Sequence, residues 1–387
     1  MGSQGPTPRI DRGLDDVVVK TSKLTFIDGE RGRLLYVGYD IRDLVEHSSF
    51  EETAFLLWHL RLPNPEELES LRRELAAHRK LTPSAVRLLR ELPKTTAPID
   101  ALRTAVSAIA SSDPELEDSS RQANLRKAIR LTAKVGTIVA AYQRIRNGLR
   151  PLPPNPAFGH AEDYLRMLLG RAPSPRDARI VDRALVMYAD HSLNASTFAA
   201  VVAGSTLADL YAAIVAAIAA LKGRLHGGAI EGALNMLLKI GSPERAEPYV
   251  LDALKRHEKI MGFGHRVYKT YDPRALLLRD MARALAEERG ERTLFETAQA
   301  VQEVVVRELG AKRVFPNVDY YAGLVYHLLG MPTDAFTPTF AVARVAGWTA
   351  QVLEYWDDNE LMRPLDWYVG PREALYVPID QRRSPAP

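Results

Sequence analysis

The chain contains no cysteine among its 387 residues. Disulfide bonds, thiolate nucleophiles and Cys-ligated metal sites are therefore excluded, and a reducing, cytoplasmic setting is expected. Long apolar runs are also missing, because the longest uninterrupted one, Leu210–Leu221, has about half the ~20 residues that a membrane span requires. We expect this run to form a buried core helix. The first residues, MGSQGPTPRI, lack an apolar segment, so no secretory signal is expected.

A strong excess of charge of one sign is missing too. Lys and Arg number 51 and Asp and Glu number 48, which gives a net charge of +3, and no long basic run occurs. The chain therefore shows little sign of binding nucleic acid or a membrane. A small acidic substrate remains compatible with this balance if several cations converge on one cleft. A chain of this length can bury a large core and suggests roughly two or three domains.

Strand signals are scarce, whereas helix-start signals recur along the chain. In six places a capping residue precedes Pro at the first helical position: Asn64-Pro65, Thr82-Pro83, Asp113-Pro114, Ser174-Pro175, Ser242-Pro243 and Asp272-Pro273. Two further pairs have the spacing of a capping box, namely Ser49 with Glu52 and Thr293 with Glu296. Apolar residues three and four apart follow these starts, which predicts an all-α fold of roughly fifteen or more helices.

One strand pair is nevertheless indicated near the N-terminus. Residues 17–19 and 25–26 are β-branched or aromatic, and Asp28-Gly29 is a turn signal, so we expect a short hairpin here. At the other end, RPLDWYVGPREALYVPI is rich in proline and aromatic residues. We expect this stretch to be an extended tail that packs on a surface.

The stretch IMGFGHRVYKTYDPR, residues 260–274, combines features that suit a functional loop. Gly262 and Gly264 carry no Cβ atom, so a ligand can approach the backbone closely. His265 adds a titratable imidazole, and Asp272 is predicted to cap the next helix. A donor-rich loop with an imidazole fits anion binding and acid–base chemistry. Taken alone, GFGH could equally be a surface turn with a stray histidine, since short glycine motifs recur by chance.

Three other segments place a His or an Asp where helices are interrupted. YADHSLNAST carries His191 before a helix that Asn194 could cap, and FPNVDYYAGL carries Asp319 directly after Pro-Asn. KGRLHGGAIEGAL carries His226 close to a predicted helix N-terminus. The partial positive charge of that terminus disfavours the imidazolium form. A neutral His226 would be a hydrogen-bond donor that can polarise a carbonyl group.

The segments GFGHRVYK, DPR and PNVDYYAGL closely resemble the active-site blocks of the citrate synthase family, and IDG, GYDI and FEE extend the likeness to the N-terminal third. The resemblance implies the short, dimeric type found in archaea and bacteria. Residues 1–222 and 331–387 would form a large helical domain, and residues 223–330 a small one that closes over the substrate. Longer bacterial members carry an additional N-terminal domain linked to NADH regulation and hexamers. Its absence here favours a homodimer.

The reaction implied by this resemblance joins acetyl-CoA, oxaloacetate and water into citrate and CoA, the first step of the tricarboxylic acid cycle. Asp319 would remove a proton from the thioester methyl group, and His226 would donate a hydrogen bond to the thioester oxygen. His265 would polarise and protonate the oxaloacetate carbonyl. No metal, cofactor or prosthetic group is implied.

Binding residues are implied in the same way. Oxaloacetate carries two carboxylates, which arginine can bind through two parallel hydrogen bonds. The residues matched to oxaloacetate or citrate binding are His191, Arg274, Arg344 and Arg363, of which Arg363 would reach into the site of the partner subunit. Those matched to CoA binding are Ile260, Gly262, Phe263 and Gly264, with Lys269 and Lys312 as phosphate contacts.

Three alternatives remain compatible with the residues. The first is 2-methylcitrate synthase acting on propionyl-CoA, or a dual-specificity enzyme, because one methylene changes binding by only ~1–3 kcal/mol. The second is a metal-dependent hydrolase built on His191, His226, His265 and Asp319, although no H-x-x-x-H pairing supports it. The third is a helical scaffold protein, although no repeat period is present.

Overall fold

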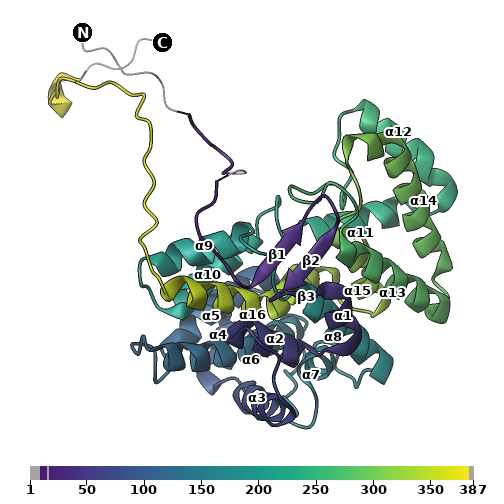
Figure 1. Cartoon of the computed structure of the whole chain (residues 1–387), viewed down its shortest axis with the longest axis horizontal. Coiled ribbons are helices and arrows are strands. Elements are labelled where there is room, and N and C mark those ends of the chain that lie inside the picture. Colours follow the sequence, from purple (N-terminus) through teal and green to yellow (C-terminus); the bar gives the residue numbers. More distant parts are fainter. Residues whose placement is uncertain (1–8, 15–16, 383–387) are drawn as a thin grey trace.

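The computed structural model describes residues 9–14 and 17–382. Within them the chain forms sixteen α-helices and one small sheet (Figure 1), which confirms the all-α prediction. The α-helices are α1 (Ile41–His47), α2 (Phe50–His59), α3 (Pro65–His78), α4 (Pro83–Glu91), α5 (Pro98–Ala110), α6 (Arg121–Arg146), α7 (His160–Leu169), α8 (Pro175–Tyr188), α9 (Ala195–Ser205), α10 (Leu210–Leu221), α11 (Ala229–Ile240), α12 (Ala246–Lys255), α13 (Pro273–Arg289), α14 (Arg292–Leu309), α15 (Val318–Leu328) and α16 (Phe336–Trp356). The strands are β1 (Thr25–Asp28), β2 (Arg33–Tyr36) and β3 (Tyr39–Asp40), and the 3-10 turns are η1 (Pro243–Arg245), η2 (Gly310–Lys312), η3 (Thr333–Ala335) and η4 (Ile379–Gln381).

Most of the predicted helix starts are confirmed. A capping side chain followed by proline opens α3, α4, α8 and α13, and Ser242-Pro243 opens η1. The capping-box serine Ser49 accepts the Glu52 N–H at the start of α2.

Two predicted starts are wrong. Asp113-Pro114 lies in a turn: the Asp113 carboxylate accepts the Glu115 N–H and also binds the side chains of Arg130 and Tyr211, but no helix follows it. The Thr293 start fails as well, since α14 already begins at Arg292.

The N-terminal hairpin forms with a different partner strand. β1 pairs antiparallel with β2, and the Asp28-Gly29 turn signal is confirmed, whereas residues 17–19 form no strand. β1 pairs with β2 and not with residues 17–19 because the alternate side chains of β2, Leu34 and Tyr36, are fully buried. The Tyr36 hydroxyl faces two backbone oxygens, that of Met187 in the last turn of α8 and that of Asp190 just after it, which ties the sheet to the segment that leads to His191.

The core is organised around α16, which is buried over nearly its whole length. It packs against α2, α6, α8, α9 and α10, so helices from distant parts of the sequence share one interior. The predicted core helix is α10, whose buried face lies against α5 and α9. Among the described residues, no helix combines the length and apolar character needed to cross a bilayer.

Helices α11–α15 pack mainly on one another and lie together at the right of Figure 1. They fall within residues 223–330, the range for which a small domain is predicted.

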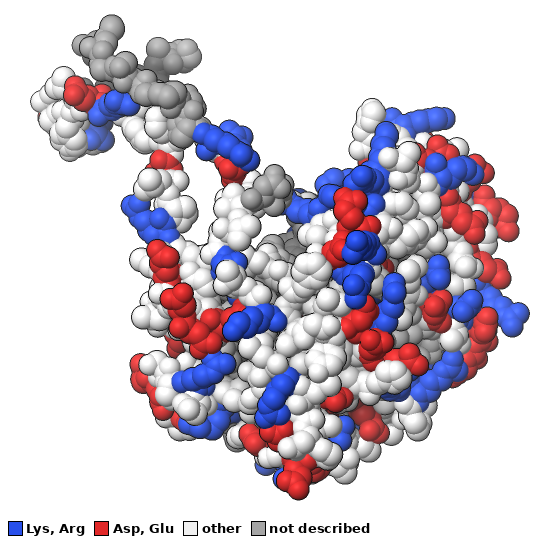
Figure 2. Space-filling view, viewed as in Figure 1, with Lys and Arg blue, Asp and Glu red and all other residues white. Residues whose placement is uncertain are grey.

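Beyond α16, residues 357–382 run as an extended chain away from the helical body (Figure 1). On the face drawn in Figure 2, positive and negative side chains intermingle over the helical body.

Candidate active site

A cavity of about 870 Å³, called the first cavity below, opens where several inter-helix segments meet α16. It is lined by all three residues predicted to carry out chemistry and by three of the four predicted to bind the substrate: His191, His226, His265, Arg274, Asp319 and Arg344. Gly264, from the predicted CoA group, also lines it. Residues separated by up to about 150 positions in the sequence therefore face one space.

The other predicted residues lie outside this lining. Ile260 is a core residue with 7% exposure, and Phe263 packs its ring on Tyr320. Lys269 donates its Nζ to the Arg266 backbone oxygen. The remaining predicted residues that do not line the first cavity are Gly262, Lys312 and Arg363, the last of which lies on the extended C-terminal segment. The CoA contacts of this group and the role of Arg363 stay predictions.

A backbone bridge fixes the His265 loop against the start of α15. Gly264 N–H donates to the Phe315 oxygen and Asn317 N–H to the Gly262 oxygen, each over 2.9 Å. The Asn317 side chain adds a third bond to the Gly264 oxygen, also 2.9 Å. Gly262 has to be glycine, since a Cβ there would lie 2.8 Å from the Tyr320 Cα. Because Asn317 also caps α15, His265 and Asp319 are held in a fixed relation.

The orientation of His265 follows from two backbone amides. Its Nδ1 accepts the N–H groups of Val267 and Tyr268 at 3.0 and 3.1 Å. In the neutral imidazole the proton must then sit on Nε2, which makes Nε2 a donor. Burial lowers the pKa of His265 to about 4, so the ring is neutral at pH 7. The arrangement leaves one N–H available to polarise a carbonyl group.

His226 is held by a network around Ser196 at the start of α9. The Ser196 Oγ lies 2.8 Å from His226 Nε2 and 2.7 Å from the Asn194 Oδ1, and it accepts Trp348 Nε1–H at 3.2 Å. Asn194 Oδ1 accepts two backbone N–H groups as helix cap, so Ser196 donates its hydroxyl to it. His226 therefore donates through Nε2 in this arrangement.

A donor at the opposite nitrogen of His226 needs a proton on Nδ1. The Ser196 hydroxyl would have to turn from Asn194 to His226 Nε2 for that tautomer to form. Burial, followed by the charge of Arg344, lowers the pKa of His226 to about 4. Both tautomers that the network permits are thus neutral at pH 7.

Asp319 is the second residue of α15, and its carboxyl group faces the first cavity. Burial raises its pKa to about 7, although the charge of Arg274 opposes the rise. Among the described residues, no hydrogen bond is made by its carboxylate oxygens. A carboxylate with a pKa near neutrality and unused oxygens is suited to accept a proton from a bound ligand.

Two buried guanidinium groups give the first cavity its positive charge. Arg274 uses Nε and Nη2 to bind Asp272 at 3.0 and 2.7 Å, which leaves Nη1 unassigned by these bonds. Arg344 donates Nε to the Tyr188 oxygen at 2.6 Å and lies 4.6 Å from the Phe340 ring centre. Each of the two side chains is only 2% exposed. Buried cations of this kind favour a ligand with two carboxylates.

His191 completes the polar lining between α8 and α9. Its Nε2 lies 3.4 Å from the Tyr268 hydroxyl, and its ring stands edge-on to His265 at 5.3 Å. Burial, followed by the charge of Arg274, lowers the pKa of His191 well below its usual range. His191 is therefore a neutral hydrogen-bonding group beside the two buried arginines.

Comparison with known proteins agrees with this constellation. A family model described as the C-terminal domain of citrate synthase matches residues 13–365. The chain belongs to the citrate synthase family. It is an enzyme, a transferase of the citrate synthase type.

Individual citrate synthases match over nearly the full length. Citrate synthase 2 of Bacillus subtilis is 48% identical over 96% of this chain and 99% of that protein. A second Bacillus subtilis protein, named citrate/2-methylcitrate synthase, is 40% identical over 93% of this chain and 96% of that protein. The solved citrate synthase of Thermoplasma acidophilum, a ternary complex with carboxymethyl-CoA and oxaloacetate, has a TM-score of 0.93 at 35% identity, covering 97% of this chain and 100% of that one.

Sequence reasoning missed several residues of this citrate synthase site. Ser196 holds His226, Asn317 bridges two loops, and Tyr268 lies against His191. Asp272 was predicted only as a helix cap, but it also pairs with Arg274. Tyr268 lies within GFGHRVYK, which carries the family resemblance, and Ser196 lies within YADHSLNAST, the segment of His191, so their positions could have marked them. Their partners are distant in sequence, however, and only the fold brings them together.

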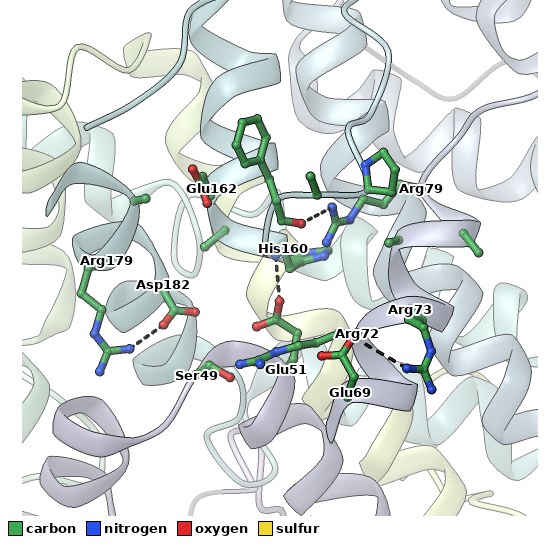
Figure 3. Close-up of a pocket in the computed structure, with 18 residues that line it drawn as sticks. Ser49, Glu51, Glu69, Arg72, Arg73, Arg79, His160, Glu162, Arg179 and Asp182 are labelled. Atoms are coloured by element: carbon green, nitrogen blue, oxygen red, sulfur yellow. Dashed lines mark hydrogen bonds and ion pairs between the residues drawn. The ribbon is translucent and has the colours of Figure 1, made fainter. Parts of the chain in front are cut away.

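A second cavity, about 740 Å³, contains none of the predicted residues (Figure 3). It lies between the starts of α2 and α7 and the helices α3 and α8. Arg179 binds Asp182 and three backbone oxygens, while Glu51 accepts the His160 N–H. Burial and the charge of Glu51 raise the pKa of Asp182 to about 6. Most charged groups here serve as helix caps and ion-pair partners.

Proposed function

We propose that this citrate synthase condenses acetyl-CoA with oxaloacetate and water to give citrate and CoA. The observation that carries the proposal is the convergence of Asp319, His226 and His265 with buried arginines in the first cavity. Support also comes from the Thermoplasma acidophilum structure, which is described with carboxymethyl-CoA and oxaloacetate and has the same fold. The reaction draws on side chains alone and calls for no metal or prosthetic group.

In the first step, the C–H bond of the acetyl methyl group breaks and Asp319 takes the proton. A thioester methyl is a very weak acid, so a carboxylate succeeds only when the developing enolate oxygen receives a fixed donor. His226 supplies this donor through Nδ1, with the Ser196 hydroxyl turned to its Nε2. The raised pKa of Asp319, about 7, makes it a better base than an ordinary carboxylate.

In the second step, the enol carbon attacks the ketone carbon of oxaloacetate and a new C–C bond forms. His265 polarises the ketone with Nε2–H and transfers that proton to the new alkoxide. Arg274, Arg344 and His191 hold the two carboxylates and so present the ketone carbon to the enol. Water then attacks the thioester carbon and gives one proton back to His265. The C–S bond breaks, CoA takes the proton held by Asp319 and leaves as the thiol, and the new carboxylic acid loses its proton to solvent.

A second acyl substrate is favoured by a specific observation. One of the relatives is named citrate/2-methylcitrate synthase, and it is 40% identical to this chain. Propionyl-CoA carries one methylene more, for which a pocket discriminates by only ~1–3 kcal/mol. Steady-state assays with oxaloacetate and either acetyl-CoA or propionyl-CoA test both possibilities. We expect the higher kcat/KM for acetyl-CoA; turnover with neither thioester would refute the proposal.

The proposal extends to a homodimer. The extended segment 357–382 exposes large apolar side chains, including Leu365 at 86%, Val369 at 84% and Leu375 at 94%. Apolar surface of this size needs cover, and a second copy of the chain provides it while Arg363 reaches the partner's first cavity.

Mixed dimers test the donation of Arg363. Arg363→Ala and Asp319→Asn dimers should each be nearly inactive, because every site then lacks one residue. Subunit exchange between them should restore about a quarter of wild-type activity, since about half the dimers are mixed and each holds one intact site. No recovery, with exchange shown by mass spectrometry, would rule out a contribution across the interface.

A further inference from the structure

The turn between β1 and β2, residues 28–32, touches the loop that carries His265. Lys269 N–H donates to the Gly29 oxygen at 2.9 Å. A Cβ atom on Gly29 would lie less than 3.0 Å from the carbonyl group of Val267. A Cβ atom on Gly32 would lie 2.7 Å from the Tyr271 oxygen. Backbone packs on backbone here, and no side chain fits between the two segments.

The residues in contact with the turn are those that orient His265. Val267 and Tyr268 give their N–H groups to His265 Nδ1, and the next N–H, that of Lys269, binds Gly29. The carbonyl group of Val267 is the one that faces Gly29. Consecutive peptide units therefore connect the turn to the imidazole, and a shift of the turn must shift the ring.

The two segments come from opposite sides of the predicted domain boundary. The turn belongs to residues 1–222, predicted for the large domain, and the loop to residues 223–330, predicted for the small one. An ion pair between Glu30 and Arg313, 2.8 Å long, spans the same boundary at the surface. Asp28 accepts the Arg31 N–H at 2.9 Å and so braces the turn itself.

We propose that Gly29 and Gly32 are positioning residues: the turn seats the 267–271 backbone, and this contact aims His265 at the substrate ketone. The inference rests on the proposed function, because it assigns to His265 the role of polarising oxaloacetate. It adds a requirement that the chemistry at His265 depends on a turn that touches no substrate.

Gly29→Ala is the direct test. Its added methyl group displaces the Val267 carbonyl, and a misplacement of about 1 Å can cost about 10²-fold in kcat. The affinity for oxaloacetate should change far less, because Arg274 and Arg344 do not touch the turn. The keto-carbonyl infrared band of bound oxaloacetate should also shift less than in the wild type, since His265 no longer points at it.

Gly38→Ala is the matched control on the same sheet. Gly38 has φ +86°, so alanine is strained there, but a Cβ atom at this position meets nothing within 4 Å. This variant should lower Tm and leave kcat and the infrared band unchanged. If Gly29→Ala behaves like Gly38→Ala, with loss of Tm alone, the turn does not position His265.

Hydrogen exchange on the wild-type protein decides the matter without any variant. Oxaloacetate should slow exchange in the peptides that span residues 28–32 and 267–271 together. Protection of the second peptide without the first would overturn the inference. A wild-type enzyme that forms no citrate would instead overturn the proposed function, so the two failures can be told apart.

Discussion

The two cavities of this enzyme are similar in volume, at about 870 and 740 Å³, and each is lined by arginines, at least one carboxylate and at least one histidine. Each also holds a carboxyl group whose pKa burial raises, Asp319 to about 7 and Asp182 to about 6. Volume and a raised carboxyl pKa therefore do not distinguish them, although the first cavity has an excess of arginines over carboxylates and the second has equal numbers of both. What differs is whether the polar atoms are already in use.

In the second cavity most of the charged side chains already have hydrogen-bond or ion-pair partners within the protein. Asp182 accepts the Phe50 N–H. It also pairs with Arg179, and Glu51 accepts the His160 N–H (Figure 3). Among the described residues neither ring nitrogen of His160 has a hydrogen-bond partner, but the side chain is only 3% exposed and its ring packs at a tilt against Phe50.

In the first cavity the hydrogen bonds between described residues orient the His265 and Arg274 side chains but do not use His265 Nε2, Arg274 Nη1 or the carboxylate oxygens of Asp319. Unused donors and acceptors, rather than size, are what single out the first cavity as the candidate active site.

The largest effect is expected from Asp319→Asn. The amide keeps the shape of the carboxylate but cannot take a proton, so kcat should fall by about 10²–10⁴-fold, the usual contribution of a general base. Oxaloacetate affinity, measured by calorimetry, should barely change because Asp319 faces the acyl group. If Asp319→Asn kept its turnover, Asp319 would not be the base, and the proposed functional difference between the two cavities would be wrong.

A somewhat smaller loss is expected from His226→Ala. Removal of one oxyanion donor costs about 10²–10³-fold in kcat. The imidazole should be neutral at pH 7, because burial lowers its pKa to about 4. Steady-state kinetics and an NMR titration of His226 check the two parts separately. A cationic ring at pH 7 would contradict the donor role whatever the kinetics show.

Whether the sequence predicts a feature of this fold depends on how far apart in the sequence the interacting residues lie. Helix starts set by local chemistry, such as Asp272 before Pro273, were predictable because cap and helix are neighbours. No helix follows Asp113, whose carboxylate accepts the Glu115 N–H within a turn and is also bound by Arg130 and Tyr211, which are more distant along the chain. The hairpin partner of β1 failed for a similar reason, because the burial of Tyr36 is decided by a segment about 150 residues away.

The candidate site shows the same division. Its lining residues could be predicted because the family motifs are local and specific. The tautomer of His226 could not, since it depends on Ser196, Asn194 and Trp348, which only the packing of α9 on α16 brings together. Nor could the use of two Arg274 nitrogens by Asp272, which limits how this arginine can bind a carboxylate.

The pH dependence of kcat/KM should show a tenfold effect per pH unit. Asp319 acts as a carboxylate, so activity is full above its pKa of about 7 and falls about tenfold for each unit below it. His226 and His265, with pKa values of about 4, stay neutral over this range and add no second limb above pH 5. A profile that is flat from pH 8 to pH 5 would show that Asp319 is an ordinary carboxylate.

The smallest effect on catalysis is expected from Asp182→Asn in the second cavity. Asp182 matches Asp319 in burial and in its raised pKa, but its partners are a backbone N–H and Arg179. An asparagine oxygen can still accept the Phe50 N–H, so kcat and both KM values should be unchanged.

Asp182→Asn should change the thermal stability of the protein although it leaves catalysis unchanged. The folded-state pKa of Asp182 is raised from 3.8 to about 6, so the folded protein binds the extra proton and the wild type loses stability as the pH rises through that window. Asparagine does not ionise, and the Tm of the variant relative to the wild type should therefore increase between about pH 4 and pH 6. If kcat instead fell as it does in Asp319→Asn, the second cavity would belong to the catalytic machinery and partner use would be a poor guide to reactivity.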